Sequence, residues 1–156
     1  MNERAEEYWR QAYEYQMSGK LQKAIEYYRK SIEVWPTAEA HTFLGWTYSF
    51  QRRYEDAIDE CKKAIDVDPA FGNPYNDIGA YLIELGRWGE AIAWFQRAIE
   101  APRYEPRHFP HFNLARVYAQ RYEYDRAIEH LEKALGLEPG YAVARRELGK
   151  LRARLN

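Results

Sequence analysis

The sequence is poor in cysteine, in net charge and in long apolar runs. Cys61 is the single cysteine, which excludes an intrachain disulfide and a thiolate cluster for zinc or iron–sulfur. Lys and Arg number 23 against 24 Asp and Glu, a formal net charge of −1 that argues against a dedicated nucleic-acid or membrane-surface binder. No run approaches the roughly 18 apolar residues of a membrane span. Because no apolar segment follows a basic start, we expect no signal peptide and a cytoplasmic protein.

Motifs of catalysis are missing as well. The chain has no glycine-rich phosphate loop, no His-Glu-x-x-His pair and no Gly-x-Ser-x-Gly elbow. His108 and His111 have a spacing that could chelate a metal, but no third ligand is evident nearby, and Pro110 suits an early position of a helix. Cys61 falls in a column of core residues, which indicates a small buried hydrophobe. We therefore expect no enzyme activity, no cofactor and no metal.

What the chain does have is an internal repeat, together with 16% aromatic residues. Four segments that begin at residues 5, 38, 72 and 108 align with a mean period of about 34 residues. One column is alanine in all four units and the next is isoleucine in all four: Ala24, Ala57, Ala91 and Ala127, then Ile25, Ile58, Ile92 and Ile128. This regularity predicts one structural unit used four times.

Each unit contains two helical patterns separated by a break. The shared positions recur at gaps of three and four residues, which places them on one face of a helix. Ser18-Gly19 and Gly86-Arg87 mark the break as a tight turn between antiparallel helices. We expect Gly45, Gly79 and the alanine of each unit's shared column where the two helices approach closely, because a larger side chain would push the helix axes apart.

These features resemble the tetratricopeptide repeat, and the match covers residues 5 to 141. The Leu-Gly pair of that family stands as Leu44-Gly45, with variants Ile78-Gly79 and Leu114-Ala115. The resemblance implies an all-α, right-handed superhelix that forms a single domain over residues 1–156. Its parts are four repeats at about 5–37, 38–71, 72–107 and 108–141, and a capping helix at 142–155.

The resemblance also implies a concave groove lined by the first helix of every unit. Among the residues predicted to face it, nine are the candidate binding residues: Trp9, Tyr13, Trp46, Phe50, Asn73, Asn76, Phe109, Phe112 and Arg116. Such a groove is aromatic at its amino end, polar in the middle, and aromatic then basic at its carboxyl end. Two interpretations of the aromatic residues stay open: some could pack against neighbouring helices, or they form an apolar strip for a peptide.

Chaperone-binding members of the family hold a terminal carboxylate with lysine, asparagine and arginine at fixed columns. In this chain those columns carry Trp9, Tyr13, Phe43, Asn73 and Asp77, so the carboxylate clamp is absent. The resemblance then implies a non-catalytic protein–protein interaction scaffold that binds a peptide or a segment of another protein.

Two other interpretations of the function remain. The chain could be a self-associating module that forms homo-oligomers through exposed aromatics and an end-to-end charge asymmetry. A weaker third reading is nucleic-acid binding through the basic final helix, which carries Arg145, Arg146, Lys150, Arg152 and Arg154. The segment Ala101–Arg107 makes the third unit two residues longer than the mean period, and it is either a tolerated surface insertion or a hinge or contact point.

Overall fold

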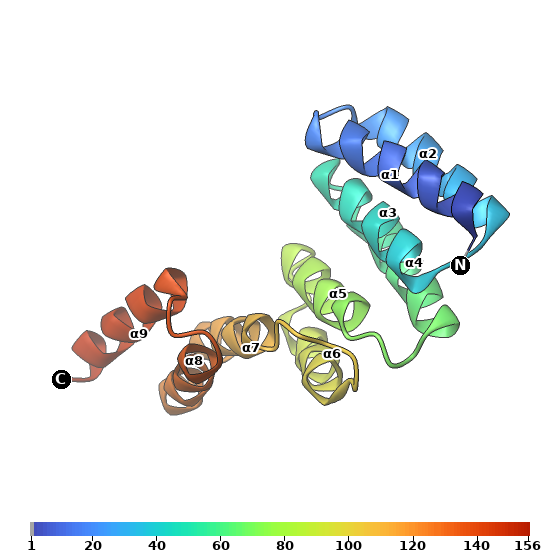
Figure 1. The fold of residues 1–156 in the computed structure, drawn as a ribbon. Helices are drawn as coiled ribbons and strands as arrows, with labels where there is room; N and C mark the ends of the chain where they lie inside the picture. Colours follow the sequence, from blue (N-terminus) through green and yellow to red (C-terminus); the bar gives the residue numbers. More distant parts are fainter. Residues whose placement is uncertain (1) are drawn as a thin grey trace.

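The computed structural model describes residues 2–156, and the secondary structure of this range is α-helical apart from one isolated bridge between Phe71 and Arg103. Nine helices follow one another in this part of the chain (Figure 1): α1 (Glu3–Met17), α2 (Leu21–Val34), α3 (Ala38–Phe50), α4 (Tyr54–Val67), α5 (Asn73–Glu84), α6 (Trp88–Glu100), α7 (His108–Gln120), α8 (Tyr124–Leu137) and α9 (Ala142–Leu155). The predicted all-α class is confirmed. None of these helices is long and apolar enough to cross a membrane.

The helices pack as consecutive pairs that line up from one end of the molecule to the other. In Figure 1 the pairs run from α1 and α2 at the blue end to α9 at the red end. The first helices of neighbouring pairs touch directly, since α3 contacts α5 and α5 contacts α7. These odd-numbered helices therefore form one layer of a superhelix, and the even-numbered helices form the other.

Each pair is closed by a turn whose central residue has a positive φ. Gly19 and Gly86 occupy this place in the first and third turns, with φ of 76° and 77°. Arg52 and Tyr122 hold the same conformation in the second and fourth turns, with φ of 60° and 61°. This left-handed conformation suits glycine and costs other residues energy, so two of the four turns are locally strained.

Small residues set the close approach of the paired helices, as predicted. Ala24, Ala57, Ala91 and Ala127 are all fully buried. A Cβ atom on Gly45 would lie 2.9 Å from the Ala57 carbonyl oxygen, and one on Gly79 would lie 2.4 Å from the Phe95 ring. Larger side chains at these positions would force the helices apart.

The segment Ala101–Arg107 is a packed connection rather than a loose surface loop. Tyr104 is buried, and the Gly72 amide donates a hydrogen bond to the Arg103 carbonyl oxygen at 3.1 Å. The Arg103 amide in turn donates to the Ala70 carbonyl oxygen at 2.9 Å, and its guanidinium lies 2.6 Å from the Asp68 carboxylate. The extra residues thus fasten the α6–α7 connection to the α4–α5 connection, which brings Tyr104 beside α5.

Candidate functional site

Aromatic side chains on α1 and α3 form one continuous strip, with Phe43 at its centre. The ring centroid of Phe43 lies 5.1 Å from that of Trp9 and 5.8 Å from that of Trp46. Tyr13 stacks on Trp9 at 5.5 Å, and Phe50 lies edge-on to Trp46 at 5.0 Å. We call these five residues the aromatic strip. Four of them are predicted groove residues, so the structure brings the amino-terminal set together.

The two interpretations of these aromatic residues apply to different members of the strip. Tyr13 and Phe50 are 38% and 55% exposed, whereas Trp9 and Trp46 are half-buried. Trp9 packs against the hydrophobic core, and its buried indole Nε1 has no hydrogen-bond partner within residues 2–156. The strip is therefore anchored by its tryptophans, and its ends are open to solvent.

A pocket of about 440 Å³ opens beside the strip, which we call the central pocket. Its walls come from α3, α5, the segment 101–107 and the start of α7. The lining residues are Thr42, Phe43, Trp46, Asn73, Asn76, Asp77, Tyr104, Pro106 and Phe109. Trp46, Asn73, Asn76 and Phe109 were predicted to face the groove, and they do share this pocket. Its size falls in the range of ligand-binding pockets, roughly 300–1,000 Å³.

Asp77 is the one acidic residue among the lining residues of the central pocket. Asp77 is half-buried as a whole residue, and protein atoms surround its carboxyl group. This burial raises the pKa of the Asp77 carboxyl to about 7, against an opposing hydrogen bond with Asn76. Within residues 2–156 no cationic side chain forms an ion pair with it.

The polar middle of the groove is a connected chain of side chains. Asn113 Nδ2 donates to Asn76 Oδ1 at 3.1 Å, which joins α7 to α5. Arg116 then donates to Asn113 Oδ1 at 3.2 Å. These groups are held in place by one another, and Arg116 remains exposed on the surface of α7. Arg116, the predicted basic residue of the groove, therefore lies next to its polar centre.

The carboxyl-terminal aromatic residues separate into two environments. Phe109 is 42% exposed and lines the central pocket. Phe112 is half-buried, with its ring centroid 5.3 Å from that of Tyr141, and together with Arg116 it lines a smaller hollow of about 40 Å³ against α8 and α9. The structure thus does not bring Phe112 and Arg116 into the central pocket.

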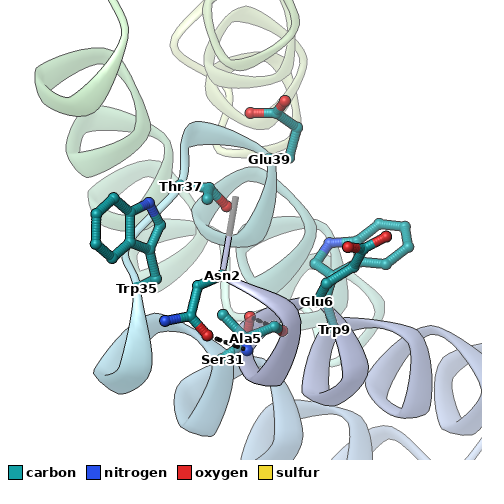
Figure 2. A pocket seen from close by; sticks show the side chains of 8 residues that line it. All are labelled: Asn2, Ala5, Glu6, Trp9, Ser31, Trp35, Thr37 and Glu39. Atoms are coloured by element: carbon teal, nitrogen blue, oxygen red, sulfur yellow. Dashed lines mark hydrogen bonds between the residues drawn. The ribbon is translucent and has the colours of Figure 1, made fainter.

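A second apolar hollow, of about 210 Å³, lies at the amino-terminal end of the molecule. Figure 2 shows its lining from the start of α1, the end of α2 and the start of α3. Asn2 caps α1 by accepting a hydrogen bond from the Ala5 amide at 3.1 Å, and the Ser31 hydroxyl donates to the Ala5 carbonyl oxygen at 2.7 Å. Trp35, 55% exposed, forms its outer edge. Trp9 lines this hollow as well, so the hollow adjoins the aromatic strip.

Four residues that line the central pocket were not among the predicted groove positions: Phe43, Asp77, Tyr104 and Pro106. In the sequence Phe43 and Asp77 stand out only as departures from the carboxylate clamp. In the structure Phe43 links the two halves of the aromatic strip. Tyr104 belongs to the extra residues before α7, outside the repeat pattern, and only the folded connection places it at the pocket. The departure of Asp77 from the family pattern was the one available signal.

His108, His111, His130 and Cys61 are packed against other side chains of the fold. His111 and His130 face each other with their Nδ1 atoms 3.1 Å apart, while His108 lies against Phe109. Across residues 2–156 no three His, Cys, Asp or Glu side chains gather as metal ligands. Cys61 is fully buried, which raises the pKa of its thiol well above the usual value. Its thiolate is therefore disfavoured as a nucleophile.

The fold and this site define an α-helical solenoid with an aromatic-lined face. Two family models described as tetratricopeptide repeat match residues 10–74 and 72–137. The chain belongs to the tetratricopeptide repeat family. Proteins of this family are generally non-catalytic interaction scaffolds, and some bind peptides.

Individual relatives agree with this assignment. Small glutamine-rich tetratricopeptide repeat-containing protein 2 of Mycosarcoma maydis is 35% identical over 79 residues, which are 49% of this chain and 22% of that protein. Type IV pilus assembly protein PilF of Pseudomonas aeruginosa is 30% identical over 141 residues, 86% of this chain and 55% of PilF. This chain thus spans about half or less of these curated relatives.

Solved structures extend the similarity over nearly the whole chain. A P. aeruginosa PilF structure has a TM-score of 0.90 at 26% identity and covers 97% of this chain and 69% of that one. A crystal structure of MamA has a TM-score of 0.78 at 28% identity and covers 97% of this chain and 82% of that one.

Proposed function

We propose that this protein is a non-catalytic scaffold that binds an extended peptide, or an extended segment of another protein, along the odd-numbered helices. The aromatic strip carries the proposal, because its rings are contiguous, its ends are exposed and it borders an open pocket. Aromatic side chains dominate the binding energy of protein interfaces. The cytoplasm remains the proposed location.

The polar centre of the groove suits the backbone of such a segment. Asn73 and Asn76 line the central pocket beside the aromatic rings, and Arg116 continues the polar series on α7. Amide and guanidinium groups can hydrogen-bond peptide carbonyls whatever the side chains of the ligand. The apolar rings would then contribute affinity, and the polar groups would fix the direction of the bound chain.

The experiment is selection from a displayed library of random peptides, followed by calorimetric titration of the best binder. Trp46→Ala should weaken binding by at least about 2 kcal/mol, which is roughly 30-fold in Kd. The matched control is Tyr122→Ala, since Tyr122 is 77% exposed in the α7–α8 turn and outside the pocket lining. Equal losses in both variants, or no loss in Trp46→Ala with an intact melting curve, would overturn the proposal.

Self-association remains the alternative, and light scattering over a dilution series tests it. Only a self-associating chain changes mass on dilution. Two of the five basic residues of the final helix have acidic partners, since Lys150 pairs with Glu147 and Arg152 with Glu132. These contacts favour the peptide proposal over nucleic-acid binding. Affinity for RNA that falls steeply with salt would contradict that preference.

A further inference from the structure

We infer that the central pocket takes a cationic side chain, a lysine or an arginine, of the segment bound in the groove. The inference rests on the proposed function and specifies the chemistry of its ligand. Asp77 lines this pocket and has no cationic partner within residues 2–156, and four aromatic residues line the same space: Phe43, Trp46, Tyr104 and Phe109. A carboxylate beside aromatic faces is the combination that binds an ammonium or guanidinium group, through an ion pair and cation–π contacts.

No lysine or arginine of residues 2–156 lines this pocket. Arg107, at its edge in sequence, donates instead to the carbonyl oxygens of Ile99 and Ala101 at 3.1 and 2.6 Å. Arg116 is directed to Asn113, and Arg103 to Asp68. Within residues 2–156 no cation–π contact involves the four rings of the pocket.

An unpaired carboxylate in such surroundings destabilises the fold. Removing a charge from water without a partner is costly, and the protein responds by favouring the protonated form. Burial accordingly raises the pKa of the Asp77 carboxyl to about 7. A cation delivered by a ligand would restore the missing partner, so binding and ionisation of Asp77 are coupled.

The test uses four capped pentapeptides, Ac-Ala-Ala-X-Ala-Ala-NH2, with X as lysine, arginine, norleucine or glutamate. Norleucine keeps the apolar stem of lysine without its charge. Binding is followed by NMR through the indole N–H of Trp46, which is assigned with the variant Trp46→Phe. We expect the lysine or arginine peptide to bind at least about tenfold tighter than the norleucine peptide, and glutamate to bind weakest. The stronger of lysine and arginine identifies the preferred cation.

Asp77→Asn should reduce that tenfold ratio to about one, because it removes the charge at nearly constant size. The matched control is Glu84→Gln, which removes an exposed charge from the same helix and should leave the ratio intact. Melting curves of both variants show that they are folded. An unchanged ratio in Asp77→Asn, or a norleucine peptide that binds wild-type protein as tightly as lysine, would overturn the inference.

Dependence on pH gives an independent readout. Affinity for the lysine peptide should rise between pH 6 and 8 in the wild type and stay flat in Asp77→Asn, since the cation requires the ionised carboxylate. The titratable groups that face Asp77 are Cys61 on α4, Tyr81 on α5 and Tyr104, and burial raises the pKa of each. They do not ionise in this range.

Failure of this inference is distinguishable from failure of the proposed function. Peptides that shift the Trp46 indole without any preference for lysine or arginine would refute the cation pocket alone. If none of the four peptides shifts Trp46, the pocket does not take a cationic side chain. The proposed function is then decided by the library-selected peptide and its dependence on Trp46.

Discussion

Gly79→Ala tests the helix spacing on which the whole superhelix depends. Gly79 lies in the interior of α5, and a Cβ atom there would be 2.4 Å from Cε1 and 2.6 Å from Cζ of Phe95. Carbon atoms in contact prefer about 3.5–4.0 Å, so α5 and α6 must separate or the Phe95 ring must move by about 1 Å. Phe95 is fully buried, so the ring has little room to move.

The net effect follows from two opposing contributions. Alanine in a helix interior is favoured over glycine by about 0.5–1 kcal/mol. Overpacking a core costs about 1–3 kcal/mol. We therefore expect Gly79→Ala to lower the free energy of unfolding by up to about 2 kcal/mol, which is a fall in Tm of up to about 4–8 °C for a chain of this length.

Gly149→Ala is the matched control, because Gly149 lies inside α9 and a Cβ there would meet nothing within 4 Å. This variant should gain about 0.5–1 kcal/mol. Urea unfolding and thermal melting of both variants measure the difference. The double variant Gly79→Ala with Phe95→Leu should show a favourable coupling energy, since the smaller side chain leaves room for the new methyl group. Stabilisation by Gly79→Ala equal to that by Gly149→Ala would refute the close approach.

Three further outcomes follow from individual contacts. Burial lowers the pKa of His111 to about 4 and also lowers the pKa of His130, so stability should be lost as pH falls from about 6.5 towards 4. His111→Gln should flatten this part of a pH series of urea unfolding curves, and an unchanged slope would contradict the prediction. Tyr28→Phe should cost about 1–3 kcal/mol in chemical unfolding, because the buried Tyr28 hydroxyl donates to Gln16 Oε1 at 2.7 Å; no loss would show that this bond contributes nothing. Arg52→Gly should raise Tm, because the positive φ of 60° costs a residue with a Cβ atom about 1–2 kcal/mol and costs glycine little. A lower Tm would show that contacts of the Arg52 side chain contribute more to stability than the strain removes.

The repeat made the fold predictable because its signals are local and occur four times. The small residues Gly79 and Ala91 indicated close helix packing, and the structure places both at the contact between α5 and α6. The turn at Gly86 could be read in the same way. The turn at Arg52 could not, because a positive φ at arginine is imposed by the antiparallel pairing and opposed by the residue itself.

The site was predictable only where it follows the repeat columns. Trp46 and Asn76 stand at columns that face the groove, so their place in the central pocket could be anticipated. Tyr104 could not be placed, since it lies in the residues that break the period and is positioned by hydrogen bonds between two connections. Phe112 was predicted in the groove but packs towards Tyr141, because the final helix begins directly after that residue and covers α8.

The most direct test of the account follows all five tryptophan indole N–H signals while the library-selected peptide is added to ¹⁵N-labelled protein. Trp9 and Trp46 belong to the aromatic strip, whereas Trp88 and Trp94 lie on α6 in the other layer, and Trp35 lies at the end of the molecule. The account predicts that the Trp46 signal shifts most, that Trp9 shifts with it, and that Trp88 and Trp94 stay in place. Shifts confined to Trp88 and Trp94 would place the ligand on the opposite layer and contradict the central claim.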